Sequence, residues 1–158
     1  MDTKLVDSFI IDILKHNVWH EGRLNKEKYY YDKLIADGFV LNEYVENIMN
    51  EFGGIKVNCI IDSKENLGYH GATFEFDIYY GWNQDFLLKP FEEKIGSTIF
   101  PIGRMYDAVV YVSDNNKIYI GDCEDLICVG IGIESYLNYL FVDDYDYEII
   151  DISDLLFE

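Results

Sequence analysis

Two histidines near the start of the sequence are the first residues that could do chemistry. His16 and His20 are four residues apart and Glu21 follows them, and two histidines at this spacing on one helical turn could bind zinc. In the metalloprotease motif the glutamate directly follows the first histidine, which is not the order here. Asn17 and Gly22 also indicate that the helix has ended. We therefore expect a solvated helix end and no metal site.

The three cysteines are a second candidate. Cys123 and Cys128, with His70 from far upstream, could form a thiol nucleophile or part of a metal site. No second Cys pair accompanies them, and Cys59 and its two counterparts all lie in strand-like contexts. Buried, reduced thiols are the usual outcome for such an odd set, so we expect structural cysteines in a reducing compartment.

A short glycine-containing segment is the third candidate. Gly130 and Gly132 stand where a strand is expected to lead into a helix, which is the position of a phosphate-binding loop. The third glycine of that fingerprint is replaced by Ser135, and Glu134 puts a negative charge in the first helical turn. The pattern favours a tight strand-to-helix turn with no nucleotide or other cofactor. Since no catalytic constellation stands out, we do not expect an enzyme.

Hydrophobic periodicity predicts helices in the first part of the chain and strands after them. The expected helices are residues 2–15 (with Asp2 or Thr3 as N-cap), 26–37, 43–52 (capped by Asn42), 84–95 (broken by Pro90) and 132–142. The expected strands are residues 55–61, 72–79, 98–100, 108–113, 117–121 and 126–130. We predict a single α+β domain over residues 1–158, with a mainly antiparallel sheet of about five to six strands against which N-terminal helices and a C-terminal helix pack.

The clearest element is a β-hairpin formed by residues 108–113 and 117–121. Asp114, Asn115 and Asn116 separate its two strands, and all three tolerate tight-turn dihedrals. We expect the segment 101–107, which begins with Pro101, to form a bend between the short strand 98–100 and this hairpin.

Negative charge is concentrated towards the C-terminus. The net charge is −18, and Lys117 is the last basic residue, so residues 118–158 carry eleven of those charges. Such a field repels nucleic acid and anionic membranes and speeds encounter with a basic protein, although solubility alone is a simpler explanation. We therefore expect neither nucleic acid nor membrane as a partner.

The sequence also bears on location. It begins without a basic leader followed by an apolar core, and no apolar run approaches the roughly 20 residues of a membrane span. We expect a cytoplasmic protein that is a monomer or a weak dimer.

Several short motifs follow one another along the chain in a recognisable order and spacing. They comprise the Trp-His-Glu-Gly-Arg segment, a Phe-Gly-Gly-Ile segment, a Phe-Glu-Phe-Asp segment and a Phe-Pro-Ile-Gly segment, with Trp19, Gly22, Arg23, Phe52, Gly53, Gly54, Phe76, Pro101 and Gly103 as key positions. Over about residues 5–141 the chain resembles the SUKH superfamily, particularly its third subfamily. We expect these key residues to be structural.

The resemblance implies an α+β domain and a function. Many bacterial members are immunity proteins that bind and neutralise a toxin, often a nuclease, whereas some relatives act as general interaction modules. We therefore expect stoichiometric binding of a cognate protein toxin that is itself basic. The alternatives are an interaction or regulatory module without a toxin partner, and a small enzyme that uses Cys123 or the two histidines.

We expect the contact surface in the C-terminal region, where tyrosines interleave with acidic residues. The predicted binding residues are Asp122, Glu124, Asp125, Glu134, Tyr139, Asp143, Asp144, Tyr145, Asp146 and Tyr147. Residues 143–158 form an acidic extension beyond the resemblance. Because this extension is rich in apolar side chains, it should pack as an added strand or against a partner. The alternative is that the tyrosines belong to the core and the acids to an ordinary surface.

Overall fold

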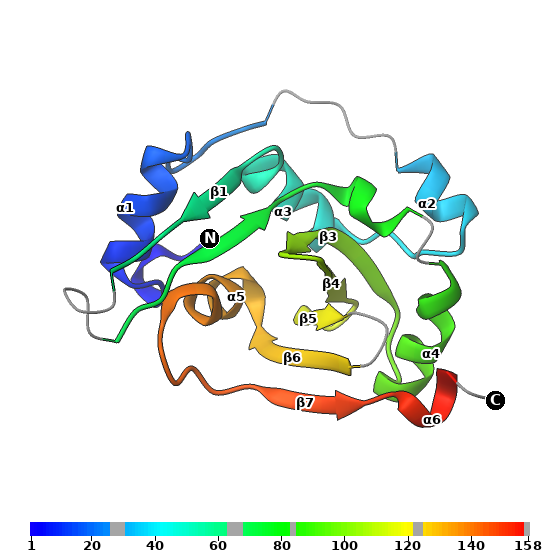
Figure 1. Ribbon diagram of the computed structural model, residues 1–158. Coiled ribbons are helices and arrows are strands. Elements are labelled where there is room, and N and C mark those ends of the chain that lie inside the picture. Colours follow the sequence, from blue (N-terminus) through cyan, green and yellow to red (C-terminus); the bar gives the residue numbers. More distant parts are fainter. Residues whose placement is uncertain (26–30, 63–67, 83–84, 122–124, 157–158) are drawn as a thin grey trace.

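The computed structural model describes residues 1–25, 31–62, 68–82, 85–121 and 125–156, and Figure 1 shows its arrangement. The helical elements are η1 (Thr3–Leu5), α1 (Ser8–His16), α2 (Asp32–Ala36), α3 (Glu43–Phe52), η2 (Ile78–Gly81), α4 (Asp85–Ile95), α5 (Gly132–Phe141) and α6 (Ser153–Leu156). The strands are β1 (Lys56–Cys59), β2 (Ala72–Glu75), β3 (Ile99–Met105), β4 (Ala108–Ser113), β5 (Lys117–Gly121), β6 (Asp125–Ile131) and β7 (Glu148–Asp151).

All strands of the described chain lie in one antiparallel sheet. Their order in space is β1-β2-β3-β4-β5-β6-β7, the same as their order in the sequence. The predicted α+β single-domain fold is confirmed. The predicted strand number was too low, because the acidic extension supplies β7, which pairs with β6 from Asp125↔Asp151 to Cys128↔Glu148.

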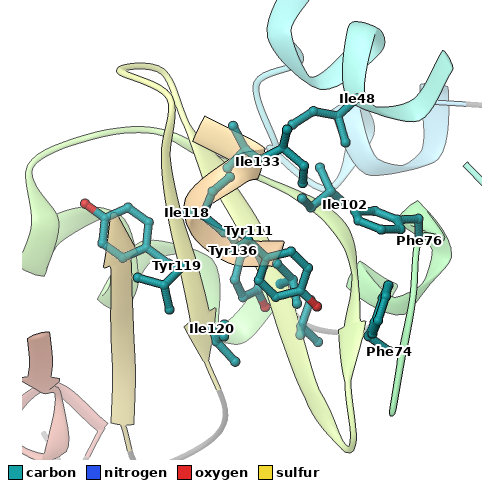
Figure 2. Close-up of a cluster of buried hydrophobic side chains, with 14 of the residues drawn as sticks. Ile48, Phe74, Phe76, Ile102, Tyr111, Ile118, Tyr119, Ile120, Ile133 and Tyr136 are labelled. Carbon is teal, nitrogen blue, oxygen red and sulfur yellow. The ribbon is translucent and has the colours of Figure 1, made fainter. Parts of the chain in front are cut away.

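The sheet bends around α5, which lies in its concave side (Figure 1). Figure 2 shows a part of the core in which Tyr136 of α5 lies near Phe74 and Phe76 of the β2 segment. The ring centroid of Tyr136 lies 6.3 Å from that of Phe74 and 6.0 Å from that of Phe76, and both contacts are edge-to-face. Burial of each such side chain contributes about 1.5 to 3 kcal/mol. On the opposite face, α4 packs through Phe91 against Tyr111 of β4.

The predicted hairpin is confirmed to the residue, since β4 and β5 have the expected bounds. The predicted bend at 101–107 was wrong. β3 continues through Pro101 and Gly103 to Met105, and the pairing with β4 shifts by one residue between those two positions. A β-bulge thus accommodates the proline inside the strand, and the turn to β4 is made only at Tyr106 and Asp107.

Three helix predictions also need correction. The first helix is divided, because Asp2 accepts a hydrogen bond from the backbone of Lys4 and caps η1, while Asp7 accepts one from Phe9 and caps α1. Pro90 does not break α4, which runs through it. The predicted helix 26–37 is reduced to α2, and residues 26–30 lie outside the described chain.

The strand predicted at 72–79 ends at Glu75. Asp77 accepts a hydrogen bond from the backbone N–H of Tyr79 and caps η2, so that a local side-chain bond replaces the strand pattern. The predicted cap of α3 is present, with Asn42 Oδ1 2.9 Å from the Val45 nitrogen.

Candidate functional site

The first motif ties α1 to the end of α3. Trp19 is buried and its Nε1 donates to Glu51 Oε1 at 3.1 Å, while its ring stacks on Phe52 with centroids 6.4 Å apart. Arg23 donates to the carbonyl oxygens of Glu51 and Gly53 at 2.7 and 2.9 Å. These carbonyls lie at the C-terminal end of α3, where a guanidinium is favourable. The contacts support a structural role for this motif.

The glycine motifs lie where backbones approach closely. Gly54 has a φ of +76° and donates from its backbone nitrogen to the carbonyl of Phe76 at 2.9 Å. A Cβ at Gly103 would lie 2.1 Å from the carbonyl oxygen of Glu75. Pro101 and Gly103 flank the bulge in β3, so these positions shape the sheet.

The two histidines at the end of α1 do not form a metal cluster. His16 Nδ1 lies 2.6 Å from the carbonyl oxygen of Asp12, one turn back, and His20 lies in the following turn with its ring beside the carbonyl of Glu21. In residues 1–25, 31–62, 68–82, 85–121 and 125–156, no group of three or more His, Cys, Asp or Glu side chains is arranged to hold a metal ion.

Cys128 is a buried free thiol beside Tyr119, whereas Cys59 is a free, partly buried thiol on β1 and Cys123 lies outside the described residues. Cys128 and Tyr119 line a hollow of about 250 Å³. His70 lines a different hollow, so the structure does not bring this thiol and the histidine into one site.

Tyr119 provides a test of this packing. Burial, followed by the neighbouring Cys128 and Glu148, raises the pKa of Tyr119 to about 12. The unfolded chain loses this proton near pH 10, so the folded state binds more protons above pH 10 and the free energy of unfolding falls as the pH rises towards 12. In urea unfolding at pH 9 and pH 11, we expect Tyr119→Phe to lose less stability than the parent. Equal losses would contradict the assignment.

The glycine turn before α5 has its donors occupied. The backbone N–H of Ile133 donates to the Tyr44 hydroxyl at 2.9 Å, and that of Gly132 donates to the Asn116 carbonyl at 2.9 Å. Glu134 lies beside them and its Oε1 accepts from the Asp2 nitrogen at 2.7 Å. This helix N-terminus is therefore used for internal contacts.

The acidic extension brings three predicted tyrosines together. Tyr139 in the last turn of α5 lies edge-to-face against Tyr145 and Tyr147, with ring centroids 6.4 and 5.6 Å away. Burial and the nearby Tyr147 raise the pKa of Tyr139. Tyr136, one turn earlier, is fully buried in the core. The tyrosines of α5 thus divide between the core and a surface cluster.

Residues from the middle of the chain complete this cluster. Tyr139, Tyr145, Tyr147 and Asp144 line a hollow of about 370 Å³, together with His70, Met105 and Tyr106. Tyr106 is 55% exposed and Tyr147 is 49% exposed. Tyr106 was not among the predicted binding residues, and His70 was considered only beside the cysteines. Both come to lie beside α5 only through the turn after β3 and the loop before β2.

A neighbouring hollow of about 340 Å³ extends the same surface. Tyr106 also lines this second hollow, with Asp107, Asp125 and Ile127. Ile149 pairs with Ile127 across β6 and β7 and is 60% exposed. We define the tyrosine surface as a selection of the residues that line these two hollows, together with the exposed neighbours Asp143, Asp146 and Ile149. It comprises Met105, Tyr106, Asp107, Asp125, Ile127, Tyr139, Asp143, Asp144, Tyr145, Asp146, Tyr147 and Ile149.

The predicted binding residues are only partly assembled on the tyrosine surface. It contains Asp125, Tyr139 and the five predicted residues from Asp143 to Tyr147. Glu134 is at the opposite end of α5, bonded to Asp2. Asp122 and Glu124 lie outside the described residues.

Charge is unevenly compensated across the molecule. Glu75 Oε2 lies 3.3 Å from Arg104 and 3.4 Å from Lys56. Burial alone would raise the pKa of Glu75, but hydrogen bonds from Tyr80 and Lys56 and the charges of both cations lower it overall. On the tyrosine surface, Asp143 Oδ1 lies 2.9 Å from His70 Nδ1. No Lys or Arg is among the described residues that line its two hollows.

The protein is a single α+β domain in which helices cover both faces of an antiparallel meander. An acidic surface with two hollows lies at one end of α5. Residues 7–142 match the SUKH-3 immunity protein family, and the chain belongs to this family. The predicted resemblance is thereby confirmed. No match was found among curated proteins or among solved structures.

The family match covers the chain from α1 to the end of α5. It leaves the segment with β7 and α6 outside, although Ile152 of this segment is fully buried in the common core. Within the described residues, no helix combines the length and apolar character needed to cross a membrane.

Proposed function

We propose that this protein neutralises a cognate protein toxin by binding it stoichiometrically through the tyrosine surface. Membership in an immunity protein family supports a toxin as the partner. The observation that carries the choice of surface is the cluster of Tyr139, Tyr145 and Tyr147, with exposed acidic residues beside it in the sequence. Partly exposed aromatic side chains supply affinity at the centre of interfaces, and charges around them supply orientation and association rate.

The charge of the protein supports a basic toxin. A net charge of −18 attracts a positively charged protein over distances comparable to the Debye length. A nuclease fits this description, because it presents a basic cleft to its substrate. Inhibition by occupation of such a cleft requires a complementary surface and no catalytic group. We place this binding in the cytoplasm, where a nuclease would meet its substrate.

The proposal is tested with the toxin candidate encoded beside the gene. We expect co-expression with the immunity protein to restore growth, and co-purification to give a complex of defined stoichiometry that dissociates at high salt. Absence of both protection and complex formation with every neighbouring toxin-like protein would contradict it and would favour an interaction module without a toxin partner.

A further inference from the structure

The larger hollow of the tyrosine surface has the composition of a cation-binding pocket. Four of the side chains that line it are tyrosines, from three separate places in the chain: the turn after β3, the end of α5 and the extension. Tyr145 and Tyr147 meet the ring of Tyr139 at interplanar angles of 77° and 82°. These rings therefore lie in different planes, and all four tyrosines line the hollow.

Asp144 gives this hollow a negative charge. It has a φ of +57° at the turn between α5 and β7 and lines the same space. Asp143 next to it is paired with His70. In contrast, no cation of the described chain lies within ion-pair distance of Asp144. The pocket therefore combines aromatic walls with a carboxylate that has no positive partner in the described part of the protein.

The size and chemistry of the hollow select its occupant. A volume of about 370 Å³ is at the lower end of the range for ligand pockets and suits one long side chain. A cation is attracted both to the aromatic faces and to the carboxylate. Of the two basic side chains, arginine has a planar, weakly hydrated guanidinium that stacks on rings and donates two hydrogen bonds to one carboxylate.

We propose that the hollow lined by Tyr106, Tyr139, Tyr145, Tyr147 and Asp144 is a pocket for an arginine side chain of the protein partner. The partner's identity as a toxin rests on the proposed function, whereas the chemistry of the pocket does not. The pocket would make one arginine an anchor at the centre of the interface, with the surrounding acids facing other basic residues.

The pocket is tested on the isolated protein with Nα-acetyl-arginine methylamide, followed by ¹H–¹⁵N NMR. We expect the largest shifts at the amides of Tyr139 and of residues 144–147, with binding at least about tenfold weaker for the neutral citrulline analogue and weaker for the lysine analogue. Similar shifts for arginine and citrulline, or shifts spread over other acidic residues, would overturn the proposal. Tighter binding of the lysine analogue would overturn the choice of arginine.

Two variants sharpen this test without disturbing the core. Tyr147→Leu removes one ring from an exposed position, and Asp144→Asn removes the charge while keeping a residue that tolerates positive φ. We expect each to weaken arginine binding about three- to tenfold, whereas Asp12→Asn on the exposed side of α1 leaves it unchanged. Unchanged binding in both pocket variants, with well-dispersed spectra, would refute the pocket.

The outcomes separate this inference from the proposed function. A variant that loses arginine binding but still neutralises the toxin with parental affinity overturns the pocket as the partner's anchor and leaves the proposed function intact. Arginine binding by a protein that neutralises no toxin supports the pocket and counts against the proposed function.

Discussion

Gly103→Ala is expected to lower the free energy of unfolding by about 3 kcal/mol, at the upper end of the range for overpacking. The new Cβ would lie 2.1 Å from the carbonyl oxygen of Glu75 and 3.1 Å from the Cα of Phe76. Both atoms belong to the backbone of the neighbouring segment, so no side chain can rotate to make room. For a domain of this size, the melting temperature should fall by about 6 to 12 °C.

Gly96→Ala is the matched control for this variant. Gly96 has a φ of +66°, and an added Cβ would meet no atom within 4 Å. Its replacement should cost about 1 to 2 kcal/mol from backbone conformation alone. Thermal and urea unfolding of both variants would compare the stability lost through steric collision at Gly103 with the stability lost through a strained dihedral at Gly96. If Gly103→Ala proved no more destabilising than Gly96→Ala, the close approach of β3 to Glu75 would not be the reason for the glycine.

Reversing three charges on the tyrosine surface is expected to slow association with a basic toxin at least about tenfold at low salt. The variant combines Asp107→Lys, Asp125→Lys and Asp146→Lys, all at exposed positions. None of these three acids lines the proposed arginine pocket. We therefore expect a smaller effect on the dissociation rate. The dependence of the association rate on ionic strength should also become shallower.

The control carries the same change in total charge at other places. It combines Asp12→Lys, Glu21→Lys and Glu93→Lys on α1, on the turn after it and on α4, where all three residues are exposed. Stopped-flow or surface-based kinetics at two salt concentrations would compare the two triple variants. Equal association rates would show that the total charge of the protein attracts the partner and that the tyrosine surface has no special part in it.

The sequence was most informative where local chemistry decides the structure. The β4–β5 hairpin follows from alternating residues around Asp114, Asn115 and Asn116, and α3 follows from its Asn42 cap and one buried face. In both cases neighbouring residues contain the signal. The position of the hairpin within the sheet follows from the strand order, because consecutive strands pair with each other.

Errors arose where distant contacts overrule local preference. A proline in a segment usually indicates a bend, but the bulge between Pro101 and Gly103 allows β3 to continue. Pro90 likewise remains inside α4, since Leu87, Leu88 and Phe91 are buried on the core side of that helix. Such outcomes depend on packing partners that are far away in the sequence.

The candidate site was predictable only in the part that lies in one stretch of sequence. Tyr139, Tyr145 and Tyr147 are close along the chain, and their interleaving with acids pointed to this region. His70 precedes β2 and Tyr106 follows β3, and only the folded sheet places both residues beside the end of α5. Glu134 was included on charge alone, although the length of α5 separates it from the other predicted residues.

The identical order of strands in sequence and in space has a consequence for how the chain folds. Each strand can pair with the one before it as soon as both are available, although η2 and α4 separate β2 from β3 and α5 separates β6 from β7. The N-terminal segment differs, because the side-chain amide of Asn138 in α5 donates to the carbonyl oxygen of Leu5 in η1, 133 residues away. During synthesis, this contact with α5 can therefore form only when nearly the whole chain is available, whereas the bonds from Trp19 and Arg23 to Glu51 need only the first third of it.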